Sequence, residues 1–179
     1  MTDTAARWPG LNTPARFVAT DVHYLSDSQA RAAAVGAYDE TFDQIAWTRT
    51  AMVTPSAPYR PGEFFRRELP ALKAVVPTED LALIIVDGYI DLDPAGRPGL
   101  GAHVHAEYGV PVIGVAKTAF RTATHAAQVL RGQSRKPLYV TAAGISVADA
   151  ARLVSGMAGK FRLPDALKLT DRLARGDRP

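Results

Sequence analysis

Apolar positions along the chain follow two periods, one typical of strands and one typical of helices. Residues 17–24 are rich in β-branched and aromatic side chains and predict a strand. Residues 31–38 and 45–53 predict two more, each bounded by polar or proline-containing segments. Because three strands follow one another with short connections, we expect an antiparallel meander.

Three later runs are continuously apolar, at residues 81–88, 110–117 and 137–144. Such runs are typical of strands that are buried on both faces, which occur mostly in sheets covered by helices. Helical spacing is found between and after them, at residues 64–76 with a kink expected at Pro70, 99–108, 146–159 and 165–175. This order predicts an α/β sandwich in which the meander leads into parallel strands, an order that the ribonuclease H-like fold shares.

The length of 179 residues fits a single domain, which we expect to span residues 1–179. The chain has no cysteine, which excludes disulfides, thiolate zinc sites and cysteine nucleophiles. The N-terminus has no long apolar core and no stretch has the length of a membrane span. We therefore expect a cytoplasmic protein that does not contact membranes; its oligomeric state is left open.

The net charge of +3 and the pI of about 9.3 are compatible with nucleic-acid binding but do not require it. Basic residues gather in the C-terminal part of the chain, at Lys160, Arg162, Lys168, Arg172, Arg175 and Arg178. They are interpreted either as a solvated helix face or as an edge that contacts phosphates.

Three carboxylates stand where burial would make an unpaired charge costly. Asp21 lies inside the first strand, although aspartate is depleted in strands. Asp87 ends the most apolar strand, where Asp-Gly could also be a simple turn. Glu68 lies in a helical segment and by itself could be a surface residue. Clustered carboxylates can hold Mg²⁺ for phosphodiester hydrolysis.

Other catalytic motifs are absent from the sequence, including a nucleotide-binding phosphate loop, H-E-x-x-H and a nucleophile elbow. The four histidines do not form a metal-ligand spacing by themselves.

Several motifs together resemble the endonuclease V family. They are T-D-V-H-Y, A-P-Y-R-P-G-E-F-F-R-R-E-L-P-A-L, I-I-V-D-G, V-P-V-I-G-V-A-K, P-L-Y-V-T-A-A-G and F-R-L-P-D-A-L-K-L-T-D. The match is collinear from about residue 17 to residue 172, and the Pro-Tyr-x-Pro-Gly…Arg-Glu and Gly-Val-Ala-Lys blocks are specific.

The resemblance implies a ribonuclease H-like core and a Mg²⁺-dependent nuclease, with Mn²⁺ as a possible substitute. It implies hydrolysis of DNA or RNA at the second phosphodiester 3′ to inosine or deoxyinosine, as in DNA repair. By motif position, Asp21, Glu68 and Asp87 are the expected catalytic and metal-binding carboxylates. The expected substrate-binding residues, among them the aromatic residue that wedges beside the lesion, are Tyr59, Arg60, Pro61, Gly88, His103 and Lys117.

The chain departs from the family pattern around the expected site. In the loop at residues 89–95, Ile90 replaces a glycine and Asp93 replaces a histidine. The family's histidine after the last core strand is absent from residues 142–146. We expect Asp91 or Asp93 to point toward the metal centre; the alternative is an exposed turn acid. A catalytically impaired binding module is the alternative to an active nuclease.

Overall fold

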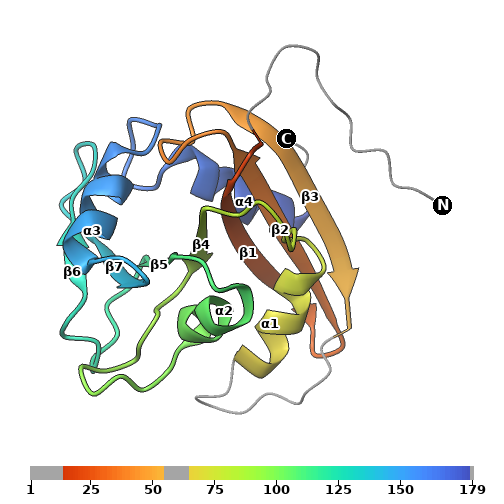
Figure 1. Ribbon diagram of the computed structural model, residues 1–179, viewed down its shortest axis with the longest axis horizontal. Helices are drawn as coiled ribbons and strands as arrows, with labels where there is room; N and C mark the ends of the chain where they lie inside the picture. Colours follow the sequence, from red (N-terminus) through yellow and green to blue (C-terminus); the bar gives the residue numbers. More distant parts are fainter. Residues whose placement is uncertain (1–13, 55–64, 178–179) are drawn as a thin grey trace.

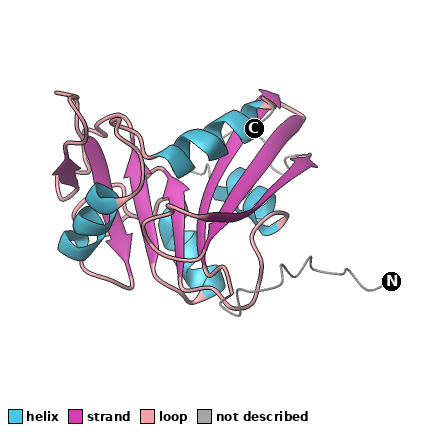
Figure 2. Ribbon diagram, turned by 90° about the horizontal axis from the view of Figure 1, so that it is seen from above, coloured by secondary structure: helices cyan, strands magenta, loops and turns pink. Residues whose placement is uncertain are grey.

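The computed structural model describes residues 14–54 and 65–177, which form a seven-stranded sheet with helices on both faces (Figure 1, Figure 2). The elements in chain order are β1 Phe17–Ser26, β2 Gln29–Ala37, β3 Ile45–Val53, α1 Phe65–Lys73, β4 Leu83–Asp87, α2 Leu100–Tyr108, β5 Val112–Ala116, β6 Ala127–Val129, β7 Leu138–Ala143, α3 Val147–Gly156 and α4 Asp165–Arg175. No helix among them is long and apolar enough to cross a lipid bilayer.

The strands lie in the order β3-β2-β1-β4-β5-β7-β6. β1, β2 and β3 are the predicted antiparallel meander, and β1, β4 and β5 run parallel to one another. β7 then pairs antiparallel with β5, and β6 pairs antiparallel with β7. The apolar run at residues 137–144 could not give this direction, because a well-buried strand has the same pattern whichever way it runs.

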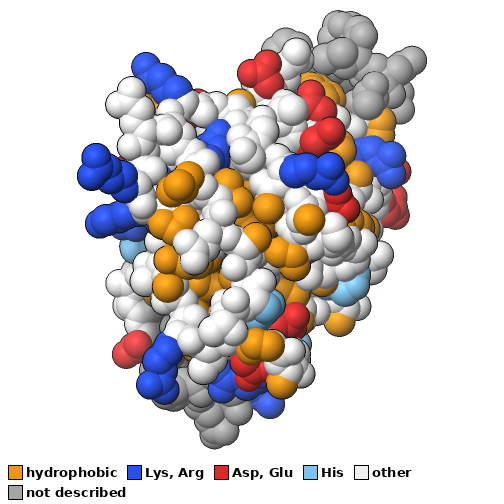
Figure 3. Space-filling model, turned by 90° about the vertical axis from the view of Figure 1, so that its left-hand side faces the viewer, with side chains coloured by type: hydrophobic (Ala, Val, Ile, Leu, Met, Phe, Trp, Pro, Cys, Tyr) orange, Lys and Arg blue, Asp and Glu red, His pale blue; other side chains and the backbone are white. Residues whose placement is uncertain are grey.

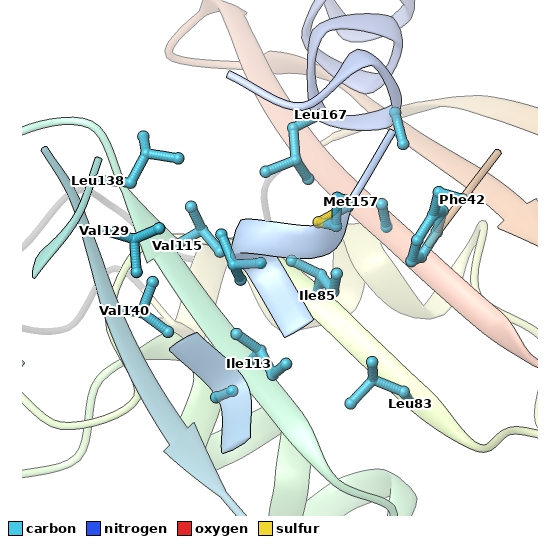
Figure 4. Packing of buried hydrophobic residues seen from close by; sticks show 14 of the residues in the cluster. Phe42, Leu83, Ile85, Ile113, Val115, Val129, Leu138, Val140, Met157 and Leu167 are labelled. Carbon is cyan, nitrogen blue, oxygen red and sulfur yellow. The ribbon is translucent and has the colours of Figure 1, made fainter. Parts of the chain in front are cut away.

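The hydrophobic core has one layer on each face of the sheet, which explains the continuous apolar runs. In β4, Ile84 and Val86 belong to the cluster under α1 and α2. Leu83 and Ile85 belong to the cluster under α3 and α4, because successive strand residues point to opposite faces. Figure 4 shows the second cluster, where Ile85 packs near Met157.

The helix ends follow from local sequence. Ser146 caps α3, since its hydroxyl oxygen accepts a hydrogen bond from the backbone N–H of Asp149 at 3.0 Å. Pro70 lies inside α1, which the structure continues to Lys73.

α4 is amphipathic and packs a buried stripe against β1 and β2. Thus α1 and α4 approach β1 from opposite faces of the sheet, and this arrangement brings their acidic side chains to the same strand.

Candidate active site

Asp21 and Asp87 lie on neighbouring strands at the point where β1 and β4 stop pairing. Parallel pairing ends with Thr20 opposite Val86, and each aspartate is the next residue in its strand. The Thr20 hydroxyl donates a 3.1 Å hydrogen bond to the Ile85 carbonyl across the two strands. The buried strands therefore present two carboxylates together where the sheet opens, the arrangement expected from the sequence.

Lys117 faces these carboxylates from the end of β5. Its Nζ atom donates to Asp87 Oδ2 at 2.7 Å and to Asp171 Oδ1 at 3.4 Å. Asp171 comes from α4 and also accepts a 2.9 Å hydrogen bond from Arg175 Nε. One ammonium thus joins the end of β4 to α4, and Asp171 becomes part of the same charged group as Asp87.

Burial and mutual repulsion make two of the carboxyl groups hard to ionise. Burial and then the charge of Asp87 raise the pKa of Asp21 to about 6, against the opposing effects of Lys117 and the Val22 backbone N–H. Burial and then the charges of Asp21 and Asp87 raise the pKa of Glu68 to about 8. Glu68 thus couples electrostatically to both aspartates, in addition to the effect of its own burial.

The neighbouring carboxylates also change the pKa of Lys117. Burial by itself would lower the pKa of Lys117, but the hydrogen bond that Lys117 donates to Asp87 and the charges of Asp87, Asp21 and Asp171 outweigh burial and raise it. Lys117 therefore stays charged, as a phosphate-binding role requires.

The donor set fits a divalent cation. Carboxylate oxygens are the ligands that Mg²⁺ prefers, and a doubly charged ion would offset the repulsion that raises the pKa values of Asp21 and Glu68. In residues 14–54 and 65–177, no three acidic or histidine side chains already enclose one point as metal ligands would. The Lys117 ammonium supplies the positive charge beside Asp87, so an ion would compete with Lys117 for this carboxylate.

A small cleft opens over the aspartates, with an empty volume of about 220 Å³. Asp21, Asp87 and Lys117 form its polar side, and Leu163 and Leu167 form its apolar wall next to α4. The cleft is open to solvent, so a bound strand would extend from it across the surrounding surface.

The structure gives different outcomes for the expected substrate-binding residues. Tyr59, Arg60 and Pro61 lie outside the described residues. Gly88 follows Asp87 with a φ of 136°, and its N–H donates to the Val115 carbonyl at 3.1 Å.

His103 lies on α2 and stacks on Phe65, with ring centroids 3.6 Å apart. Burial and the charge of Arg66 lower the pKa of His103. Phe65 is the first residue of α1, so this stack joins α2 to the start of α1.

Asp171 is the site residue that sequence reasoning missed, because the C-terminal helix looked like an ordinary solvated face. A signal was nevertheless present. Leu167, Thr170, Asp171 and Ala174 have the i, i+3, i+4, i+7 spacing of one helix face, and three of these four are buried. An acid within a buried stripe needs a partner, which Lys117 provides.

In the altered loop, Asp93 makes the contacts of the alternative, a turn acid. Its Oδ1 atom accepts a 3.1 Å hydrogen bond from the Arg97 backbone N–H, and its carboxylate pairs with the Arg97 side chain at 3.6 Å. Asp93 is therefore a turn acid beside Pro94. Asp91 forms an isolated bridge with Pro98, and neither acid is among the charges that shift the pKa of Asp21 or Glu68.

Comparison with known proteins shows the family to which this fold and sequence belong. The family model described as "Endonuclease V" matches residues 6–131. The chain belongs to the endonuclease V family. An endonuclease V of Azotobacter vinelandii is 35% identical over 80% of this chain and 74% of its own length. An endonuclease V of Xylella fastidiosa is 32% identical over 92% of this chain and 77% of its own length.

Solved endonuclease V structures have the same fold. The Streptomyces avermitilis protein superposes with a TM-score of 0.71 at 28% identity, covering 91% of this chain and 81% of that one. A Ciona intestinalis endonuclease V, in complex with a 23-mer DNA containing an inosine followed by a ribo-adenosine, superposes with a TM-score of 0.71 at 22% identity, covering 89% and 83%. The mixed seven-stranded sheet with helices on both faces is thus the ribonuclease H-like fold of this family, whose members are divalent-metal nucleases.

Proposed function

We propose that this protein is an endonuclease of the endonuclease V type, which uses Mg²⁺ to hydrolyse a phosphodiester 3′ to inosine, deoxyinosine or another deaminated base in DNA or RNA. The observation that carries the proposal is that Asp21 and Asp87 each directly follow the last paired residues of β1 and β4, with Lys117 bound to Asp87. Membership of the endonuclease V family supports the substrate class.

The residues divide into three roles. Asp21 and Asp87 would hold the cation, with Glu68 and Asp171 as neighbours that add negative charge. When bound, a divalent ion neutralises charge on the phosphate and lowers the pKa of water. Lys117 holds its charge beside the same carboxylates and is placed to bind a phosphate oxygen.

Glu68 and the apolar wall of the cleft affect proton exchange and water content beside the carboxylates. A carboxyl group with a pKa of about 8 holds a proton near neutral pH until a cation or substrate changes its surroundings, so Glu68 can exchange a proton there. The apolar wall at Leu163 and Leu167 limits the water beside the carboxylates. Lower water content strengthens the electrostatic interactions on which this chemistry depends.

A cleavage assay tests the proposal. Strands that carry one inosine, as DNA and as RNA, are incubated with the protein and Mg²⁺, Mn²⁺ or EDTA, beside matched strands with adenosine. We expect a cut 3′ to inosine with either metal and none with EDTA. Binding of the strands without cleavage under any of these conditions would instead favour the impaired binding module.

Lys117→Ala is expected to weaken nucleic-acid binding roughly tenfold, because the variant loses one ammonium–phosphate contact. The dependence of log K on log salt should flatten by about one unit for the same reason. Fluorescence anisotropy over a salt series measures both quantities. Lys117→Arg keeps the charge and should keep the wild-type slope; an unchanged slope in Lys117→Ala would show that the ammonium pairs only with Asp87 and Asp171.

A further inference from the structure

The segment between α3 and α4 is fixed from beneath by a buried arginine. Arg131 follows β6 and is only 6% exposed. Its guanidinium donates to the carbonyls of Phe161 and Gly159, each at 3.0 Å, and to that of Met157. Several N–H donors of this buried cation form hydrogen bonds to carbonyls of one loop. These bonds hold the backbone of that loop in a single arrangement.

Phe161 nevertheless directs its ring outward from this fixed backbone. The residue is 55% exposed, although a phenyl ring of this size is ordinarily buried. Two ammonium groups flank it, with Lys168 Nζ 4.0 Å and Lys160 Nζ 5.4 Å from the ring centroid. The surface thus offers a flat apolar group and two positive charges on backbone that is already ordered. Binding a ligand here would therefore not cost the entropy of ordering this loop.

The same segment connects Phe161 directly to the candidate active site. Arg162 donates from Nη2 to the Lys117 carbonyl, and also to the Pro137 carbonyl at 2.7 Å. The next residue, Leu163, forms part of the wall of the cleft that contains Asp21. A strand whose phosphate lies at Lys117 would therefore leave the cleft close to Phe161.

We propose that Phe161, Lys160 and Lys168 bind an unpaired nucleotide that flanks the cleaved phosphate, the ring stacking on its base and the two ammonium groups contacting its phosphates. The proposal rests on the proposed function, because it requires a strand in the cleft. Aromatic rings beside lysines are the usual surface for single-stranded nucleic acid, and stacking tolerates any base.

The face of the molecule that carries β6 and α3 gathers hydrophobic side chains in its middle, with basic and acidic side chains toward its margins (Figure 3). A second exposed aromatic residue, Phe120, lies three positions after Lys117 and is 42% exposed. It gives the strand another contact beyond the cleft, but among residues 14–54 and 65–177 only Phe161 has two cations at its ring.

The test measures binding of single-stranded, inosine-containing oligonucleotides by anisotropy in EDTA, using long strands and strands shortened on the 5′ or the 3′ side. Phe161→Ala should weaken binding of the long strand roughly 5- to 50-fold, and shortening on one side should remove the difference from wild type. Phe161→Trp should bind as tightly as wild type. Phe161→Leu should bind as weakly as Phe161→Ala, because leucine keeps apolar area but has no ring to stack. Lys168→Ala should flatten the salt dependence by about one unit.

Lys73→Ala is the matched control, because Lys73 pairs with Glu107 as Lys168 pairs with Asp165, but Lys73 belongs to α1 on the opposite face of the sheet. It should leave binding unchanged. Equal binding of the long strand by Phe161→Ala and wild type would overturn the inference while leaving the proposed function intact. A change in oligomeric state in Phe161→Ala, seen by light scattering with unchanged strand binding, would assign the ring to a contact between copies. Failure of the wild-type protein to bind or cut any strand would overturn both proposals.

Discussion

Asp87→Asn is expected to abolish strand cleavage and to leave nucleic-acid binding intact or tighter. Asp87 stands at the end of a buried strand beside Asp21 and is the carboxylate to which Lys117 donates at 2.7 Å. In the proposed reaction it holds the ion that stabilises charge building up on the phosphate, so its loss acts on the transition state. We expect the single-turnover cleavage rate to fall by roughly 10³-fold or more.

Binding should respond in the opposite direction, because the asparagine removes a negative charge that repels phosphate. Anisotropy in EDTA measures this separately from cleavage. Asp93→Asn is the matched control, since Asp93 belongs to the turn beside Arg97 and should cleave at the wild-type rate. Wild-type cleavage by Asp87→Asn would rule out the proposed metal mechanism.

Metal-free Asp21→Asn is expected to be more stable than the metal-free wild type at pH 8. The pKa of Asp21 is raised from 3.8 to about 6 by burial and then by the charge of Asp87. A raised folded-state pKa means that the native state binds the proton more tightly than the unfolded chain. Stability from this group is therefore present below about pH 4 and is lost as pH rises through about 6.

The shift corresponds to about 2–3 kcal/mol of stability lost on ionisation, which asparagine avoids. Thermal unfolding in EDTA at pH 5 and pH 8 measures the effect, and the gain in melting temperature should be larger at pH 8. Mg²⁺ or Mn²⁺ should stabilise the wild type at pH 8 and have little effect on Asp21→Asn.

Asp149→Asn provides a control of opposite sign. The hydrogen bond from Ser146 and then the interactions with Arg152 lower the pKa of Asp149, so its charged form stabilises the fold and this contribution is lost as pH falls through the lowered pKa. Its replacement should reduce stability at pH 8 and leave the metal response unchanged. If Asp21→Asn is no more stable than wild type at pH 8, the charge of Asp21 does not oppose folding.

Much of the fold could be predicted because it depends on local periodicity. The double-sided burial of β4 and β5 produces continuous apolar runs, and the meander follows from three short, closely spaced strands. β6 was not predicted, because three residues, Ala127–Val129, are too few to show a period. The direction of β7, antiparallel to β5, could not be predicted from its apolar pattern either.

The residues of the candidate site likewise fall into those that the sequence could predict and those that it could not. Asp21 and Asp87 were predictable because a carboxylate in or after an apolar strand conflicts with its surroundings. Glu68 could be selected only through the family motif, since one acid on a helix is ordinary. Asp171 and the linkage from Arg131 through Arg162 to Lys117 depend on contacts between residues far apart in sequence, which periodicity does not encode.

The position of a bound Mn²⁺ ion tests the central claim most directly. Crystals of the wild-type protein soaked in Mn²⁺ should show one or more anomalous peaks within coordination distance of carboxylate oxygens of both Asp21 and Asp87, with Lys117 Nζ moved away from Asp87. The same soak of Asp87→Asn crystals should lose the peak. A peak at another place, or none beside these two carboxylates at saturating Mn²⁺, would contradict the account of this site as a metal-dependent nuclease centre.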